Sequence, residues 1–139
     1  MAEKFVGKWK LSSSENFDEF MKKLGVGFVM RKLGNSLKPT LLIQYGGEIG
    51  DNRWKITSVT SIKSTSICFE LNKEFDEETH DGIKVKSIVT LEPANKLVHT
   101  QRENGKLLCS FTRFINENGE QIVILKADDI EAKRVFHRC

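Results

Sequence analysis

The sequence predicts an all-β fold, either a sandwich or an up-and-down barrel, in which a pair of short helices caps one end. From Pro39 onward, short strands recur at roughly ten-residue spacing. Hairpin turn signals separate them: Gly46-Gly47, Asp51-Asn52, Asp81-Gly82, Asn104-Gly105 and Asn118-Gly119. Closing successive hairpins into a barrel would remove the exposed edges of the sheet.

Helical spacing is confined to residues 16–36, after the first expected strand. Asn16 is expected to cap a first helix, and Gly25 is expected to end it. The apolar residues of this helix recur at three- and four-residue steps and are Phe17, Phe20, Met21 and Leu24. A second short helix is expected from Phe28 to Gly34.

The composition is typical of one globular domain, which is expected to span residues 1–139. Of its residues, 39% are hydrophobic and 29% are charged, and no repeat, linker or low-complexity segment divides the chain. The net charge of +3 is spread along the chain, which argues against a nucleic-acid-binding protein. The N-terminus lacks the features of a secretory signal, so a cytoplasmic location is expected.

Neither a metal site nor a catalytic site is apparent in the sequence. Cys68, Cys109 and Cys139 are an odd number without a Cys-x-x-Cys pair, so free thiols are expected. No known nucleophile, metal or phosphate-binding motif occurs, so neither an enzyme nor a cofactor is expected. His80 is expected in a solvated loop within residues 77–82. His99 is expected inside the protein beside Gln101, in a satisfied polar pair or with an ordered water.

Two arginines on apolar strand faces are the most informative feature. Alternation places Arg113 on the side of Leu107, Cys109 and Phe111. The same count places Arg134 on the side of Ala132 and Phe136. An inward-facing guanidinium stays charged and needs an anion, and its fork matches a carboxylate. The sequence therefore indicates a site for an apolar carboxylate.

Alternation alone leaves two other interpretations of these arginines open. A β-bulge could shift the strand parity and turn one or both of them to the solvent. They could instead face inward and form an ion pair with a structural Asp or Glu. A further feature, the basic residues Lys22, Lys23, Arg31 and Lys32 of the helical segment, could contact an anionic membrane or simply be solvated.

Motifs along nearly the whole chain resemble those of the intracellular lipid-binding proteins, the fatty-acid-binding protein family. They are Gly7 to Leu11, Asn16 to Met21, Gly25 to Phe28, Arg31 to Gly34, Lys38 to Thr40, Glu74 to Glu77, Val85 to Ser87 and Arg134 to Phe136. The resemblance implies a barrel of about ten antiparallel strands with a helix-turn-helix lid. It also implies a monomer that binds and transports a long-chain fatty acid without covalent bonds.

The resemblance assigns the ligand carboxylate to Arg113, Arg134 and the position of Phe136. It places Phe17, Met21, Val26, Leu33 and Ile62 at the entrance and upper cavity. His99, Gln101, Phe111, Val123 and Leu125 are expected in the cavity as well.

The sequence departs from the family pattern at the ligand-binding end. Phe136 stands where relatives carry a tyrosine, so a hydrogen bond worth roughly 0.5–1.5 kcal/mol is expected to be missing. The tracts 110–113 and 127–129 resemble the retinoic-acid-binding branch, so a retinoid carboxylate is an alternative ligand. A membrane-docking or protein-interaction module is a second alternative. The long turn 46–52 has no functional interpretation.

Overall fold

The computed structural model describes residues 2–79 and 82–139, and the expected turn at Asp81 and the expected loop at His80 fall outside them. The strands are β1 (Gly7–Glu15), β2 (Thr40–Tyr45), β3 (Arg53–Val59), β4 (Ser64–Glu70), β5 (Phe75–Glu78), β6 (Lys84–Glu92), β7 (Lys96–Glu103), β8 (Lys106–Ile115), β9 (Gln121–Ala127) and β10 (Ile130–Arg138). The helices are α1 (Phe17–Lys23), α2 (Phe28–Ser36) and the short 3-10 turns η1 (Ala2–Phe5) and η2 (Gly47–Ile49).

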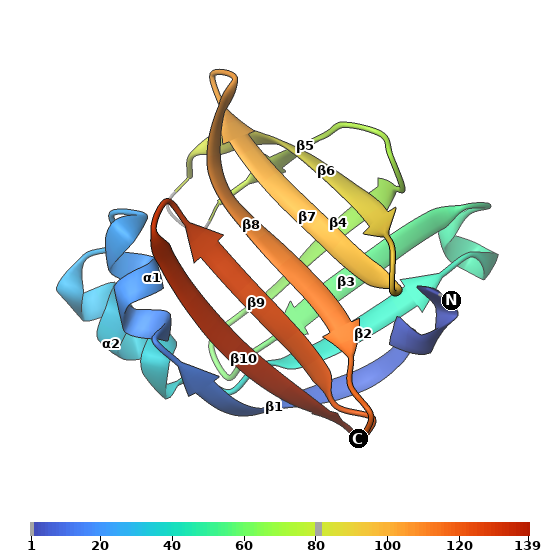
Figure 1. Ribbon diagram of the computed structural model, residues 1–139, viewed down its shortest axis with the longest axis horizontal. Helices are drawn as coiled ribbons and strands as arrows, with labels where there is room; N and C mark the ends of the chain where they lie inside the picture. Colours follow the sequence, from blue (N-terminus) through green and yellow to red (C-terminus); the bar gives the residue numbers. More distant parts are fainter. Residues whose placement is uncertain (1, 80–81) are drawn as a thin grey trace.

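The ten strands form one antiparallel sheet that rolls into a nearly closed barrel (Figure 1). Each strand pairs with its neighbours in sequence, and β1 joins β10. The sheet ends at β4 and β5, which are not paired with each other. The helices α1 and α2 connect β1 to β2 and lie at one end of the barrel, while the N-terminus lies at the other. The predicted barrel and helical cap are confirmed.

The turn between β7 and β8 shows why the turn signals were informative. Asn104 has φ 52° and Gly105 has φ 81°, the left-handed pair that a two-residue hairpin requires. The turn between β6 and β7 has the same character without a glycine, because Ala94 has φ 66° and Asn95 has φ 57°. Sequence patterns therefore found one of these two turns and overlooked the other.

The first helix begins where expected, although Asn16 does not cap it as expected. Asn16 has φ 60° and makes no side-chain cap hydrogen bond. Its amide nitrogen instead donates to the backbone oxygen of Glu131, at 2.9 Å. Asn16 therefore ties the start of α1 to β10, and tertiary contact takes precedence over local capping.

The second helix continues past Gly34 to Ser36, so the expected end at Gly34 is wrong. A Cβ at position 34 would lie 3.0 Å from the sulfur of Met21. Gly34 therefore lets α2 approach α1 closely, which explains a glycine inside a helix.

A β-bulge in β8 changes one predicted face. Gln101 pairs with Cys109 and Arg102 pairs with Leu107, which leaves Leu108 without a partner in the register. Leu107 is exposed, so its expected place beside Cys109 on the inner face is wrong. The bulge precedes Cys109, and the alternation from there to Arg113 is undisturbed.

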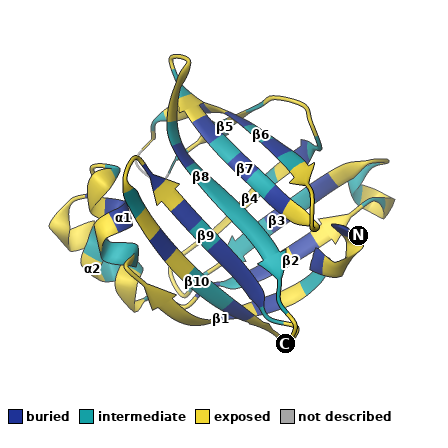
Figure 2. Cartoon of the chain, viewed as in Figure 1, coloured by how far each residue is buried: buried dark blue, intermediate teal, exposed yellow. Residues whose placement is uncertain are grey.

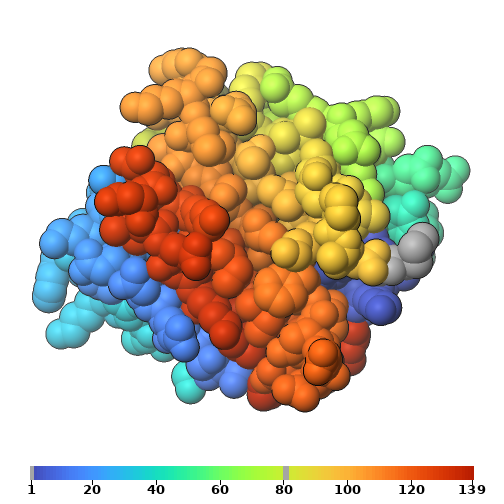
Figure 3. All heavy atoms as spheres, in the orientation of Figure 1, coloured from blue at the N-terminus to red at the C-terminus, as the bar shows by residue number. Residues whose placement is uncertain are grey.

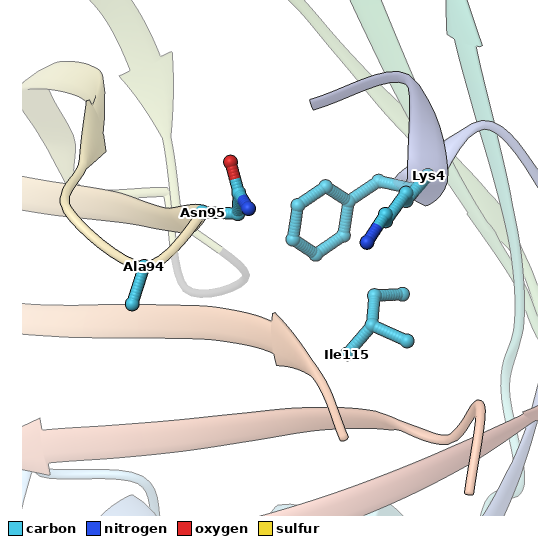
Figure 4. Close-up of a pocket in the computed structure, with 5 residues that line it drawn as sticks. Lys4, Ala94, Asn95 and Ile115 are labelled. Atoms are coloured by element: carbon cyan, nitrogen blue, oxygen red, sulfur yellow. The ribbon is translucent and has the colours of Figure 1, made fainter. Parts of the chain in front are cut away.

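The barrel interior is filled at the end remote from the helices. Side chains with almost no exposed surface include Phe5, Trp9, Ile43, Phe69 and Leu97. A pocket of about 60 Å³ lies at this end, lined by Lys4, Phe5, Ala94, Asn95 and Ile115 (Figure 4). It is far smaller than the pockets that hold small-molecule ligands. This pocket is therefore too small to hold a lipid.

Candidate functional site

The two arginines face the same side of three adjacent strands. Arg113 on β8 pairs with Val123 on β9, and Val123 pairs with Arg134 on β10. Because directly paired residues point to the same face of a sheet, both guanidiniums project from one inner row. Along β10, Ala132 and Phe136 are buried and the residues between them are more exposed, while Val123 on β9 is buried (Figure 2). The parity shift to the solvent does not occur.

Each arginine contacts neutral groups only. An Nη1–H of Arg113 donates to Oε1 of Gln121 at 3.1 Å, and Nε–H of Arg134 donates to Oγ of Ser14 at 3.0 Å. The guanidinium of Arg134 also lies 3.9 Å from the ring centre of Phe17 in α1. Within residues 2–79 and 82–139, neither arginine forms an ion pair with an Asp or Glu. The structural ion pair considered as an alternative is therefore not found there.

The environment disfavours the two positive charges. Burial lowers the pKa of Arg113 to about 10. Burial, together with the charge of Arg113, lowers the pKa of Arg134 to about 10. Both groups remain protonated near neutral pH, because these pKa values lie well above 7. The site is thus a double cation without a counter-charge in the described part of the chain, and a bound anion would relieve its repulsion.

Phe136 lies beside the arginine row on the same face of β10. It is buried and pairs with Leu11 of β1 and Gln121 of β9. Its ring packs into the apolar core and carries no hydrogen-bonding group. The resemblance places a ligand-binding group at this position, and here that position offers only apolar contact.

A second polar cluster inside the barrel centres on Glu77. His99 Nε2 lies 2.9 Å from Oε1 of Glu77, and the hydroxyl of Ser87 donates to the same oxygen at 2.8 Å. Burial alone would raise the pKa of Glu77. Hydrogen bonds from His99, Ser87 and Gln101 and the charge of His99 outweigh it, so the pKa is lowered. The expected solvated loop from residue 77 is wrong at this point, because Glu77 belongs to β5.

The five other residues expected in the cavity lie on β7 to β9 and are buried or half-buried. His99 and Gln101 are buried, and the oxygen of Gln101 accepts from the thiol of Cys109 at 3.2 Å. Val123 and Leu125 are buried as well. Phe111 is half-buried, and its ring contacts Phe20 of α1 edge-on at 6.0 Å and the ring of His99 at 5.3 Å. Aromatic contacts thus join the strand that carries Arg113 to the first helix.

The residues expected at the entrance are divided by the structure. Met21 and Val26 are buried, Phe17 and Leu33 are half-buried, and Ile62, in the turn between β3 and β4, is 58% exposed. The helix α1 packs against β10, and in the space-filling view the two lie side by side (Figure 3). The helices therefore cover the end of the barrel at which Arg134 meets Phe17.

Two of the four basic residues of the helices have acidic partners. Lys23 lies 3.4 Å from Asp128, in the turn between β9 and β10, and Arg31 lies 3.2 Å from Asp18. Lys22 and Lys32 are exposed. The most exposed apolar side chains of the lid are those of α2: Phe28 (64%), Val29 (77%) and Met30 (52%).

The thiols are free, as expected. Cys68 and Cys139 are exposed, whereas Cys109 is buried, and burial together with the charge of Glu77 raises its pKa to about 12. Among the described residues, no group of three His, Cys, Asp or Glu side chains is placed to hold a metal ion. In the part of the chain that the structure describes, no helix has the length and apolar character needed to cross a membrane.

Sequence reasoning missed three polar residues, of which Gln121 is buried, Glu77 is half-buried and Ser14 is exposed. Gln121 lies two residues before Val123 and four before Leu125, so alternation along this strand could have placed all three on one face. Glu77 was hidden because the acidic run 76–78 is typical of a solvated turn. Ser14 lies beyond a bulge in β1, since Leu11 pairs with Phe136 and Ser13 with Val135. That bulge cannot be located by alternation.

A ten-stranded barrel with a helical lid and an inward-facing cationic site defines the class of small lipid-binding barrels. The model of the lipocalin / cytosolic fatty-acid binding protein family matches residues 6–132. A muscle fatty acid-binding protein of Schistocerca gregaria is 42% identical over 98% of both chains. The sodium/calcium exchanger regulatory protein 1 of Doryteuthis pealeii is 38% identical over 99% of this chain and 98% of its own.

Solved structures agree with the sequence comparisons. A Schistosoma mansoni fatty acid binding protein in complex with arachidonic acid superposes with a TM-score of 0.88, at 33% identity, over 99% of this chain and 98% of its own. The chain belongs to the lipocalin / cytosolic fatty-acid binding protein family. Membership confirms the predicted family and the predicted class, a binding protein rather than an enzyme.

Proposed function

We propose that this protein binds a long-chain fatty acid inside the barrel, with the carboxylate between Arg113 and Arg134, and transports it through the cytosol as a monomer. One observation carries the proposal: two half-buried cations share one inner face, and neither has a carboxylate partner among the described residues. A fatty-acid carboxylate would supply the missing charge with fork-shaped hydrogen bonds. The apolar tail would lie against inner side chains such as Phe111 and Leu125.

The relatives support the same ligand class. The names of the Schistocerca gregaria protein and of the Schistosoma mansoni structure state fatty acid binding, the latter with arachidonic acid. A retinoid carboxylate remains the second candidate ligand, because the site recognises the carboxylate and the sequence tract at 110–113 resembles the retinoic-acid-binding branch. The two arginines disfavour a neutral ligand such as retinol, because their charges would stay unpaired.

Calorimetric titration of the delipidated protein with oleate tests the proposal. Tight one-to-one binding by the parent protein and weakened binding by Arg113→Ala and Arg134→Ala are expected. Competition between retinoic acid and oleate then distinguishes the two ligand classes. Unchanged oleate affinity in both variants would show that the carboxylate lies elsewhere.

We further infer that ligand transfer involves brief membrane contact through α2. Its exposed side chains Phe28, Val29 and Met30 and the exposed bases Lys22 and Lys32 suit an interface with anionic lipid. A carrier that collides with membranes transfers a fluorescent fatty acid faster as the vesicle concentration rises. Transfer to vesicles containing phosphatidylserine should therefore depend on vesicle concentration, and Val29→Ser should slow it without changing oleate affinity.

Transfer that is independent of vesicle concentration would instead identify a diffusional carrier and rule out this role of α2. The name of the Doryteuthis pealeii relative keeps a protein-interaction role as an alternative. Such a role predicts no dependence of transfer on anionic lipid, so the same measurement separates the two.

A further inference from the structure

Gln121 is a buried polar residue at the start of β9 that has no assigned role. Its side chain has no exposed surface. In the register, Gln121 pairs with Ile115 on one side and Phe136 on the other. It therefore lies one inward-facing step from Val123, the residue flanked by Arg113 and Arg134.

The orientation of the Gln121 amide is fixed by its contact with Arg113. A guanidinium carries donors only, so the amide atom that meets Nη1–H of Arg113 at 3.1 Å must be the oxygen. The amide nitrogen points to another side of the same planar group. Among the described residues, it is the only buried side-chain nitrogen or oxygen without a hydrogen-bond partner.

An unpaired buried N–H destabilises a folded protein and calls for an explanation. The amide nitrogen belongs to the same planar group as the oxygen that contacts Arg113. An anion bound to that guanidinium therefore lies within reach of the nitrogen. A carboxylate oxygen is an acceptor that this N–H lacks. The ring of Phe136, directly across the register, provides no competing polar atom.

We propose that the Gln121 amide nitrogen donates a hydrogen bond to the carboxylate of the bound fatty acid and takes the role of the hydroxyl that Phe136 lacks. This inference rests on the proposed function, since it deepens the same site. It makes Gln121 a third ligand-binding residue, and one that discriminates carboxylates from ligands without an acceptor at that point.

Oleate titration of Gln121→Met, which keeps the length of the side chain but removes the amide, tests the inference. Affinity should fall about tenfold, as for one hydrogen bond to a charged group. The exposed Gln44, on β2, provides a matched control, and Gln44→Met should bind oleate like the parent. Introducing Phe136→Tyr should restore affinity in Gln121→Met by a larger factor than it improves the parent.

Side-chain amide NMR separates direct binding from mere support of Arg113. The NH₂ resonances of Gln121, assigned by their loss in Gln121→Met, should shift downfield when oleate binds. Oleate binding that leaves these resonances unmoved, or a Gln121→Met variant that binds as tightly as the parent, would overturn the inference. Failure of the proposed function has a different signature, because the parent itself would then not bind oleate or Arg113→Ala would bind it unchanged.

Discussion

Two polar clusters occupy the interior of the barrel, and they differ in one respect, the presence of a counter-charge. On β5 to β7, the carboxylate of Glu77 accepts from Ser87 and pairs with His99. On β8 to β10, Arg113 and Arg134 contact only neutral groups among the residues that the structure describes, and they repel each other. The first cluster is complete within the protein, whereas the second is not.

This difference separates a structural cluster from a binding site. A buried charge with its partners in place stabilises the fold, and its pKa shifts in the direction that favours the charged form. The lowered pKa of Glu77 is an example. A buried charge without a partner destabilises the fold, and its pKa shifts in the direction that favours the neutral form. The lowered pKa of Arg113 is an example. Stability is given up at the site where a ligand is expected to act.

Removing a charge from each cluster should therefore have opposite effects on the free energy of unfolding. The largest effect is expected at Arg113. Arg113→Met should lower oleate affinity by about 1.5–3 kcal/mol, on the order of tenfold to a hundredfold, because charge-assisted hydrogen bonds are lost. The ligand-free variant should be more stable than the ligand-free parent by about 1–2 kcal/mol. Calorimetric titration and urea unfolding of delipidated protein provide the two values.

Arg102 offers a matched control, since it is an exposed arginine on β7. Arg102→Met should change neither oleate affinity nor stability appreciably. If Arg113→Met destabilised the ligand-free protein, Arg113 would have to be counted with the structural cluster, and the contrast between the clusters would fail.

Glu77→Gln should act in the other direction, lowering the free energy of unfolding by about 1–2 kcal/mol at pH 7, because the bonds to His99 and Ser87 lose their charge assistance. The pKa of Glu77 is lowered in the fold from its ordinary 4.5. The contribution of the ionised Glu77 to stability is therefore present above pH 4.5 and is lost as the pH falls below that value. Urea unfolding from pH 7 to pH 3 should show the difference between parent and variant shrinking. A constant difference would contradict the assignment.

Much of the fold could be predicted from the sequence, and the errors have local physical causes. Turn chemistry and alternation predict the hairpins, and helical spacing places the lid after β1. Alternation predicts the wrong face for Leu107, because a bulge of one residue has no sequence signature. The sequence predicts a helix end at Gly34, because its close contact with Met21 is a tertiary property that the pattern does not contain.

The site divides in the same way. Alternation predicts Arg113 and Arg134 on inner faces, and their buried charge predicts an anion. That both flank Val123 depends on the register of three strands, which one sequence does not fix. Glu77 could not be found, because only the pairing of β5 with β6 turns one member of an acidic run inward.

A hydroxyl at position 136 would add a hydrogen-bond donor to the arginine cluster, beside Gln121. Phe136→Tyr should raise oleate affinity by about 0.5–1 kcal/mol, roughly two- to fivefold, because the phenol can donate to the carboxylate. The stability of the ligand-free variant should fall slightly, since without the ligand carboxylate the buried hydroxyl lacks its hydrogen-bond partner. Titration and unfolding of the same preparation measure both effects. Lower affinity would show that the carboxylate does not reach Phe136.

The smallest effect is expected one residue from Glu77, at Asp76 on the outer face of β5. Asp76 pairs with Lys86 of the neighbouring strand, and both side chains are exposed. Solvent screens this ion pair, so Asp76→Asn should change the free energy of unfolding by less than about 0.5 kcal/mol. Urea unfolding beside Glu77→Gln compares two adjacent acidic residues on one strand. An equal loss at both positions would mean that burial does not distinguish them, and the role of the inner cluster in stability would have to be abandoned.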